Sequence, residues 1–484
     1  MSLQWQAAIQ SGAPLLLMAA GIVLLMLLIA SARNHRAIAQ LTTLGFLLTF
    51  GVCLIPQGSV ELTPLLVVDD TARFAIALVA AAGVITVLLL YGYVEAYDGV
   101  REEMYLLLLI AALGAMVLAC AQHAASLLLG LETLSVALFG MIAYTHKRKR
   151  SLEAGIKYLV LSAAASATLL FGFALLYAAC GALQFDAIGA ALETLTPDER
   201  AIAWAGLALI WAGFGFKLSL VPFHLWTADV YEGAPAPVSG FLAAVSKGLV
   251  AVVLLRWLSP VALTQTPVLH LALGGVAVLS IVVGNLGALQ QNNVKRVLAY
   301  SSIAHTGYLL VPFLVGGVVA REAVLVYVTC YTVMTLGCFG AVTILSGPAG
   351  ERDADHLYDY RGLFWRRPLV TSVFAPMLLA QAGLPLTAGF LAKLYVLAAA
   401  VERHAWWLAL AVVAGSAVGL YYYLRLIVVQ FLPKPGGMRR EGVLSETSVT
   451  AGIALLLLFV ALIGLGVQPQ PLLAGVTEVL RLPP

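Results

Sequence analysis

Apolar residues follow one another in fourteen long runs along this chain, separated by short polar or Gly/Pro-containing stretches. The runs cover approximately residues 12–31, 37–55, 72–93, 104–121, 124–145, 153–181, 200–221, 237–258, 268–289, 296–318, 322–346, 369–402 with a break, 405–431 and 448–468. About 20 consecutive apolar residues cross a bilayer core as an α-helix. The runs are continuous rather than alternating with polar residues, which argues against a β-barrel. The pattern therefore predicts an all-α polytopic membrane protein with about 14 transmembrane helices.

Composition narrows the possible functions. Of the 484 residues, 62% are hydrophobic and 11% are charged, whereas a typical soluble domain is about 25% charged. These values exclude an ordinary water-soluble enzyme, and they exclude disorder, which requires low hydrophobicity. A net charge of +3 gives no indication of a nucleic-acid partner. The five cysteines form no C-x-x-C pair, so the sequence predicts neither a metal site nor an iron–sulfur site in this chain.

Lysine and arginine residues outside the runs fall mostly on one side of the expected membrane. That side holds sixteen cations: Arg33, Arg36, Arg101, Lys147, Arg148, Lys149, Arg150, Lys295, Arg296, Arg352, Arg361, Arg366, Arg367, Lys434, Arg439 and Arg440. The other side holds five: Arg73, Arg200, Arg321, Arg403 and Arg481. Cytoplasmic loops carry the excess of Lys and Arg, so the first side is expected to be cytoplasmic. An even number of spans then places both termini in the periplasm of an inner-membrane protein.

Two features indicate an internal repeat. A Glu-Ala pair followed by a tyrosine begins at Glu153 and again at Glu322, five expected helices later, and an odd number of helices between repeats inverts their topology. The seventh expected span ends near Pro222, and Pro385 interrupts the twelfth; each proline removes a backbone hydrogen bond and breaks a helix. Broken helices at matching places in two inverted repeats are typical of ion-transporting proteins. Two kinks that serve only packing remain an alternative interpretation.

Several charged residues lie inside the expected spans, where a charge costs about 2.5–3.5 kcal/mol on insertion scales. Glu132 lies in the middle of the fifth span, and Lys217 lies beside the break of the seventh. Lys247 lies deep in the eighth span, His305 in the tenth, and Lys393 follows the break of the twelfth. We expect these five residues to be functional. A static buried ion pair of glutamate and lysine is the alternative, although apolar residues replace such a pair at no net cost.

Three further cations inside the spans are weaker candidates. Lys157 is close enough to the end of its span to reach the cytoplasmic surface, yet it is kept as a possible functional residue. Arg425 follows three consecutive tyrosines and is either functional or an anchoring group. Arg256 lies near the end of its span, and we expect its side chain to extend to the membrane surface.

The buried charges suit the relay of protons. Removal of an amine from water favours its neutral form, and a nearby carboxylate favours its charged form. Movement of a carboxylate toward or away from a lysine therefore loads or unloads a proton. A titratable imidazole between lysines could pass protons through water. The sequence contains no nucleophile–base pair or phosphate-binding loop that would indicate other chemistry.

At these residues the chain resembles a known family. Five stretches carry the resemblance: LLGLETLS at 128–135, KRSLEAGIKY at 149–158, FGFKLSLVPFHLW at 214–226, GAPAPVSGFLAAVSK at 233–247 and NVKRVLAYSSIAH at 293–305. They are similar to the antiporter-like membrane subunits of the bacterial proton-pumping NADH:quinone oxidoreductase, respiratory complex I. The resemblance extends over nearly the whole chain.

The resemblance implies a fold, a function and a set of partners. It implies two inverted five-helix repeats, with discontinuous helices 7 and 12, and a division of the chain into 1–103, 104–258, 259–433 and 434–484. It implies a proton relay through Glu132, Lys217, Lys247, His305 and Lys393. FMN, iron–sulfur clusters and quinone would belong to other subunits, and the partners would be other membrane-arm subunits, including a second antiporter-like subunit, and lipids.

Sister subunits of the family differ from this chain in two details. The M type resembles it but has a glutamate at the position of Lys393. The L type has a long lateral helix after its last core span, whereas only sixteen residues follow 448–468 here. Two other interpretations stay open: a cation/proton antiporter, alone or in a multi-subunit complex, and a membrane scaffold whose charges only pair statically.

Overall fold

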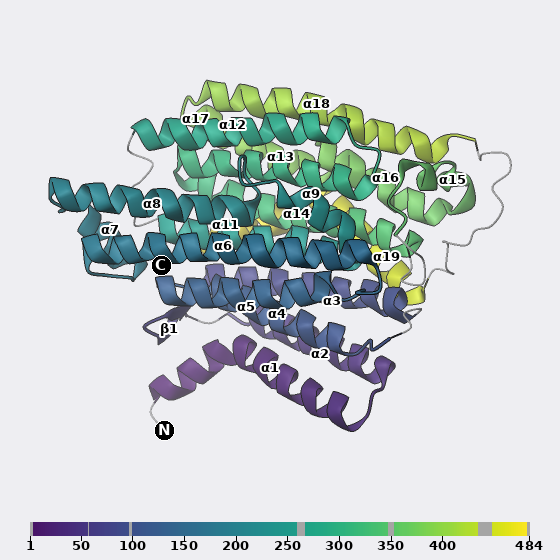
Figure 1. Ribbon diagram of the computed structural model, residues 1–484, viewed down its shortest axis with the longest axis horizontal. Coiled ribbons are helices and arrows are strands. Elements are labelled where there is room, and N and C mark those ends of the chain that lie inside the picture. Colours follow the sequence, from purple (N-terminus) through teal and green to yellow (C-terminus); the bar gives the residue numbers. More distant parts are fainter. Residues whose placement is uncertain are drawn as a thin grey trace.

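The computed structural model describes residues 3–56, 58–95, 99–258, 267–346, 353–433 and 448–481, and its long helices lie side by side in one bundle (Figure 1). The first helices are α1 (Leu3–Ser31), α2 (His35–Cys53), α3 (Asp70–Glu95), α4 (Glu103–Ala119), α5 (Ala124–Ile142), α6 (Lys149–Cys180), α7 (Phe185–Leu192), α8 (Pro197–Leu218), α9 (Trp226–Gly233), α10 (Ala236–Phe241), the π-helix η1 (Leu242–Ser246) and α11 (Lys247–Leu258). The later helices are α12 (Pro267–Leu289), α13 (Val294–Val315), α14 (Val318–Leu345), the 3-10 helix η3 (Leu357–Tyr360), α15 (Leu363–Arg366), α16 (Pro368–Ala382), α17 (Ala388–Glu402), α18 (Trp406–Phe431), α19 (Val449–Val467) and α20 (Gln470–Arg481).

The helices match the predicted spans in number and place. Twelve stretches among the described residues are long and apolar enough to cross a membrane. Two shorter apolar helices, α4 and α16, occupy the fourth and twelfth predicted positions. α16 is short because the twelfth span is interrupted, and α17 completes it. The all-α polytopic class is therefore confirmed. Both termini lie at the same end of the bundle (Figure 1). The expected division points at 259 and 434 lie outside the described residues.

A short β-hairpin was not expected from the sequence. Strands β1 (Val60–Thr63) and β2 (Leu66–Val68) pair antiparallel between α2 and α3. The backbone N–H of Val67 donates to the carbonyl of Cys120 at 2.9 Å, so the hairpin covers the end of α4. Strands of three and four residues are too short to leave a periodic signal in an otherwise apolar sequence.

Both predicted helix breaks are present. α8 ends at Leu218, Ser219 adopts a left-handed conformation with φ of 62°, and helical structure resumes at α9; Pro222 lies in the connecting segment. α16 ends at Ala382, Gly383 has φ of 88°, and Pro385 lies in the segment before α17. Each break leaves the carbonyl groups of a helix C-terminus inside the bundle, where they attract cations.

The same close helix contact occurs at two places about 170 residues apart. A Cβ at Gly114 would lie 2.5 Å from the backbone nitrogen of Leu134. A Cβ at Gly284 would lie 2.5 Å from the backbone nitrogen of Ala304. Only glycine permits this approach of α4 to α5 and of α12 to α13. Two related repeats would each contain such a glycine contact at the same position.

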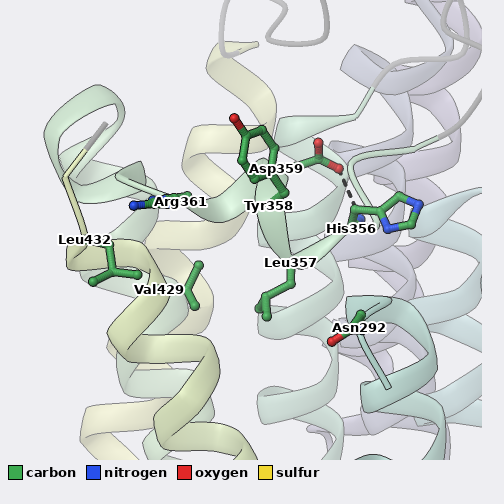
Figure 2. A pocket seen from close by; sticks show the side chains of 8 residues that line it. All are labelled: Asn292, His356, Leu357, Tyr358, Asp359, Arg361, Val429 and Leu432. Carbon is green, nitrogen blue, oxygen red and sulfur yellow. Dashed lines mark hydrogen bonds between the residues drawn. The ribbon is translucent and has the colours of Figure 1, made fainter. Parts of the chain in front are cut away.

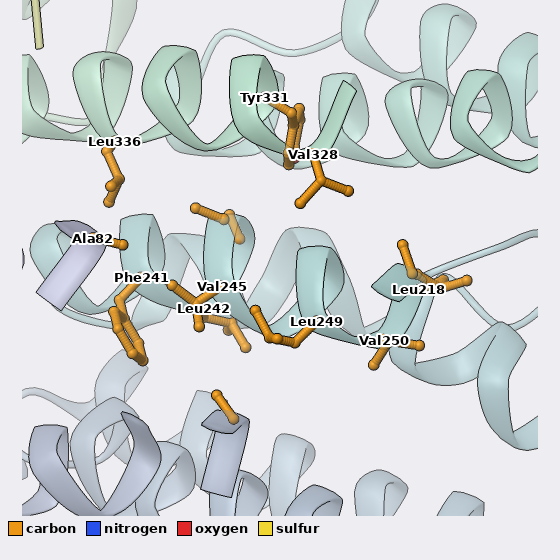
Figure 3. Packing of buried hydrophobic residues seen from close by; sticks show 14 of the residues in the cluster. Ala82, Leu218, Phe241, Leu242, Val245, Leu249, Val250, Val328, Tyr331 and Leu336 are labelled. Carbon is orange, nitrogen blue, oxygen red and sulfur yellow. The ribbon is translucent and has the colours of Figure 1, made fainter. Parts of the chain in front are cut away.

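The centre of the bundle is built by α13, α14 and the continuous stretch α10–η1–α11, whose residues are almost all buried. Figure 3 shows Leu242, Val245 and Leu249 of this stretch packed beneath Val328 and Leu336 of α14. Polar residues on these helices therefore face other helices rather than lipid. A π-turn such as η1 frequently lies at a functional site, and here it ends directly before Lys247.

Candidate functional site

Lys217 lies in the last turn of α8, directly before the first helix break, and its side chain is buried. Its ammonium donates to the Ser135 hydroxyl of α5 at 2.7 Å and to the Ser162 hydroxyl of α6 at 2.8 Å. A cation is favoured at the C-terminal end of a helix because the free carbonyl groups carry partial negative charge. The site therefore stabilises a protonated lysine without a direct counter-ion.

Glu132 lies one turn before Ser135 on α5 and is half-buried. Its carboxylate accepts a hydrogen bond from the Ser166 hydroxyl of α6. Within the described part of the chain, Glu132 and Lys217 form no ion pair within 4.0 Å. The static ion pair considered as an alternative is thus absent. Leu129 and Val136, on the same side of α5, are exposed, so Glu132 borders an outer face of this chain.

Lys247 is fully surrounded by protein, and its ammonium donates to the Ser302 hydroxyl of α13 at 2.6 Å. The Tyr331 hydroxyl of α14 donates to the same oxygen at 2.6 Å. The ring centre of Tyr231 lies 5.5 Å from the Lys247 nitrogen, within the range of a cation–π contact. Three helices thus meet at Ser302.

His305 lies one turn after Ser302 on α13, and both ring nitrogens face tyrosine hydroxyls. Nδ1 is 2.6 Å from the Tyr327 hydroxyl, and Nε2 is 3.3 Å from the Tyr423 hydroxyl. The Tyr331 ring lies 5.4 Å from the imidazole, centre to centre. A neutral imidazole accepts at one nitrogen and donates at the other, so this arrangement can exchange a proton with either side.

Lys393 extends back from α17 to the break of the twelfth span. Its ammonium donates to the Ala382 carbonyl at 2.9 Å and to the Gln381 carbonyl at 3.1 Å, both at the end of α16. The sequence places Lys217 before its proline and Lys393 after its own. In three dimensions, each of these lysines lies at the C-terminal end of the first half of a broken helix.

The structure groups the predicted residues in two sets. Lys247, His305 and Lys393 share neighbours: Tyr331 contacts Ser302 and His305, and Tyr308 contacts both His305 and Lys393. Lys217 and Glu132 form a separate set on α5, α6 and α8. Among the described residues, no hydrogen-bond partner is common to the two sets.

Lys157 lies at the surface, away from both sets. It pairs with Glu153 at 2.6 Å and with Asp229 of α9 at 2.8 Å, and its side chain is 40% exposed. Arg296 joins the same charged cluster through Asp229 at 2.7 Å and Glu232 at 2.9 Å. A cavity of about 160 Å³ opens among these side chains.

Arg425 and Arg256 have structural partners. The Arg425 guanidinium donates to the Asn292 side-chain oxygen at 2.5 Å and to the Leu289 carbonyl at 3.4 Å, so it caps the C-terminal end of α12. The Arg256 side chain is mostly buried and pairs with Asp69, directly before the start of α3, where the Asp69 carboxylate also accepts from the Ala72 N–H. Its expected extension to the membrane surface stays a prediction.

Sequence reasoning missed a buried cluster around Asp353. This carboxylate pairs with Lys295 and Arg148, each at 2.9 Å, and accepts hydrogen bonds from the Tyr93 hydroxyl and the Ala236 N–H. Burial raises the pKa of Asp353, but the charges of Lys295 and Arg148 outweigh it and hold that pKa below its usual value. The group joins α3, α6, α10 and α13 at one end of the bundle.

The hydroxyl groups around the lysines were also missed. Ser135 and Ser302 lie one turn from Glu132 and His305 respectively, so polar residues at helical spacing on an apolar span were an available signal. The tyrosines gave no such signal, because buried tyrosines are common in apolar spans. Within the part of the chain that the structure describes, no three His, Cys, Asp or Glu side chains group as a metal site.

Broken helices with buried lysines at the breaks define a transporter-like membrane subunit, and comparisons specify which one. The family model for the transmembrane region of NADH:quinone oxidoreductase and Mrp antiporter subunits matches residues 121–419. NADH-quinone oxidoreductase subunit N of Ectopseudomonas mendocina is 50% identical over 468 residues, covering 95% of this chain and 94% of that protein. Subunit N of Chromohalobacter salexigens is 49% identical over 464 residues, covering 95% and 96% respectively.

A solved structure agrees with these relatives. A chain of respiratory complex I from Thermus thermophilus, determined with bound aureothin, superposes with a TM-score of 0.81 at 33% identity, covering 95% of this chain and 98% of that one. The chain belongs to the NADH-quinone oxidoreductase subunit N family of antiporter-like membrane proteins.

Proposed function

We propose that this chain is a proton-translocating membrane-arm subunit of NADH:quinone oxidoreductase. The observation that carries the proposal is the burial, inside a bundle of this family, of three lysines and a histidine whose polar contacts are hydroxyl and carbonyl groups. Charges held without direct counter-ions in a membrane protein are costly and mark ion pathways. The relatives are named as subunit N of NADH-quinone oxidoreductase, and we assign the pathway to that enzyme.

The proposed relay begins at the cytoplasmic side. The cluster of Lys157, Asp229 and Glu232 surrounds an open cavity and offers carboxylates to incoming protons. Buried hydroxyls of Ser219 and Thr227, on either side of the first break, have no hydrogen-bond partner among the described residues and are suited to hold water. Protons would pass through this region to load Lys217 and Lys247.

Movement of charge would drive the transfer. A shift of the Glu132 carboxylate, or of charge in a neighbouring subunit, changes how strongly Lys217 holds its proton. The proton on Lys247 then passes through Ser302 and Tyr331 toward His305, and from there to Lys393. Hydrogen bonds join Lys247, Ser302 and Tyr331. Ring contacts rather than hydrogen bonds join Tyr331 to His305 and Tyr308 to Lys393, so water would carry the proton over those two steps.

The complete enzyme requires other subunits. FMN, iron–sulfur clusters and quinone are assigned to those subunits, where NADH is oxidised and quinone reduced. The exposed face of α5 around Glu132 suits a contact with another membrane-arm subunit, and we assign a second antiporter-like subunit as one such neighbour. The excess of Lys and Arg on one side supports an orientation with both termini in the periplasm and the Asp353 cluster at the cytoplasmic end.

Gentle extraction of the tagged chain from native membranes tests this function. We expect a large assembly with NADH:quinone reductase activity. A small assembly that is stable in mild detergent and lacks this activity would contradict the proposal and favour a cation/proton antiporter. Cation-dependent proton flux in liposomes would then identify that antiporter.

Replacement of Ser302 by alanine tests the link between Lys247 and His305. A hydrogen bond to a charged group contributes about 1.5–3 kcal/mol, so we expect proton pumping to fall about tenfold. The measurement is NADH-driven proton uptake by inside-out membrane vesicles. Thr343→Val is the matched control, because Thr343 is a buried hydroxyl on α14 that bonds only its own helix at Phe339. Equal pumping by both variants would remove Ser302 from the relay.

A further inference from the structure

A cavity of about 440 Å³ opens at the end of the bundle that we assign to the cytoplasm (Figure 2). Asn292 and Leu357 form one wall, and Val429 and Leu432 near the end of α18 form another. Figure 2 shows His356 and Asp359 at its rim, where the His356 N–H donates to the Asp359 carboxylate at 3.1 Å. The relay described above does not use this cavity.

A second, much smaller cavity lies next to the first, on the side of α12 and α18. Its volume of about 10 Å³ is close to the space that one water molecule needs. Asn292 and Leu357 line both cavities, so they are adjacent. Ala288 of α12 and Tyr422 of α18 complete the inner wall.

A row of polar side chains continues from the small cavity toward the middle of the bundle. The Tyr422 hydroxyl donates to the Asn285 side-chain oxygen at 3.1 Å, and the Asn285 amide donates to the Tyr308 hydroxyl at 3.1 Å. The Tyr308 ring centre lies 5.1 Å from the Lys393 nitrogen. The row thus leads from an open cavity to a buried lysine.

α18 approaches this row closely. A Cβ at Gly415 would lie only 2.8 Å from the Tyr308 hydroxyl, and a Cβ at Gly419 would lie 3.2 Å from the Asn285 side-chain oxygen, so glycine lets the α18 backbone contact these polar groups directly. The Ser416 hydroxyl is buried and faces the Tyr308 hydroxyl, so it adds a further polar group to the row. Buried polar groups in a row are sites where water can be bound.

Arg425 lies where the two cavities meet. Its guanidinium lines the small cavity and bridges from α18 to Asn292, which belongs to both cavities. Its charge is offset there by the carbonyls of Leu289 and Gln291 at the end of α12. Movement of this one side chain would join the outer cavity to the polar row.

We propose that this row is a water branch through which Lys393 exchanges protons directly with the cytoplasm, in addition to its exchange with His305. In the loading step, a water beside Lys393 gives a proton to the neutral amine: one N–H bond forms, one O–H bond breaks, and the resulting hydroxide takes a proton from the next water toward the cavity. Arg425 acts as the gate. The proton-carrying role rests on the proposed function, but the presence of water does not.

Thiol reactivity tests the branch in the intact complex. Ala288→Cys places a thiol on the small cavity, and Ala277→Cys places one on the same helix away from it; both alanines are fully buried. Methyl methanethiosulfonate reaches both positions through lipid, and only a thiolate, which needs water, reacts with it. Peptide mass spectrometry of inside-out vesicles separates these sites from the native cysteines. We expect the thiol of Ala288→Cys to react at least about tenfold faster than the thiol of Ala277→Cys.

Equal rates at the two positions would overturn the proposal. If Ala288→Cys does not assemble, Val297→Cys on the small cavity and Ala304→Cys on the same helix form the substitute pair.

Replacement of Asn285 by leucine tests proton transfer along the row. It should reduce NADH-driven pumping at least about threefold, with Thr343→Val as the control. Unchanged pumping would also overturn the role of the branch. The thiol rates remain informative in a complex without NADH activity, so failure of the proposed function is distinguishable.

Discussion

Replacement of Lys217 by methionine is expected to reduce proton pumping by at least about 100-fold, the lower range of what a positioned acid–base group contributes. Methionine fills a similar space and needs no counter-charge, so the fold should persist. The loss arises because Ser135 and Ser162 then face no proton carrier at the first break. The measurement is the ratio of protons pumped to NADH oxidised in inside-out vesicles.

Lys149→Met is the control for this variant, since Lys149 is an exposed lysine at the start of α6. An unchanged ratio of protons to electrons in Lys217→Met would contradict the relay. Combined replacement of Lys217 and Glu132 by apolar residues distinguishes a proton relay from a membrane scaffold. Intact pumping in that double variant would favour a scaffold whose charges have no transport role.

Replacement of Asp353 by asparagine is expected to have the largest effect on stability. Removal of one member of a buried ion cluster costs about 3–5 kcal/mol, because Lys295 and Arg148 keep their charges without a counter-ion. We expect little assembled complex and a lower temperature of inactivation. Glu193→Gln makes the same chemical change at an exposed position and should assemble normally.

The pH dependence of this cluster follows from the low pKa of Asp353. A carboxyl group whose pKa is lower in the folded state stabilises the fold above its unfolded pKa, near 3.9, and loses this contribution as the pH falls through the folded value. The cluster should therefore remain intact at neutral pH. Normal assembly of Asp353→Asn would show that the cluster does not hold this end of the bundle together. Recovery of yield in Asp353→Asn with Lys295→Gln would identify charge imbalance as the cause.

The candidate site was predictable where a residue conflicts with its local surroundings. Lys217, Lys247, His305 and Lys393 stand out because each interrupts an apolar run. Lys157 satisfies the same criterion, yet its side chain reaches a surface cluster with Asp229. Position within a run does not reveal which side of the helix a residue occupies or how far a long side chain extends. Helical spacing alone therefore does not separate buried relay residues from surface pairs.

The sequence by itself determined the membrane class, the fourteen spans, the two breaks and four buried relay candidates, Lys217, Lys247, His305 and Lys393. Each of these depends on neighbours along the chain: the length of an apolar run, a proline without an N–H, a charge among leucines. Only the tertiary structure decided that Lys217 is held by two serines, that Lys393 reaches back to the carbonyls of α16, and that Glu132 and Lys217 are not paired. The serine contacts of Lys217 join helices that are 55 and 82 residues apart in sequence, and the Lys393 contact spans a break between consecutive helices. Packing of the whole bundle fixes both.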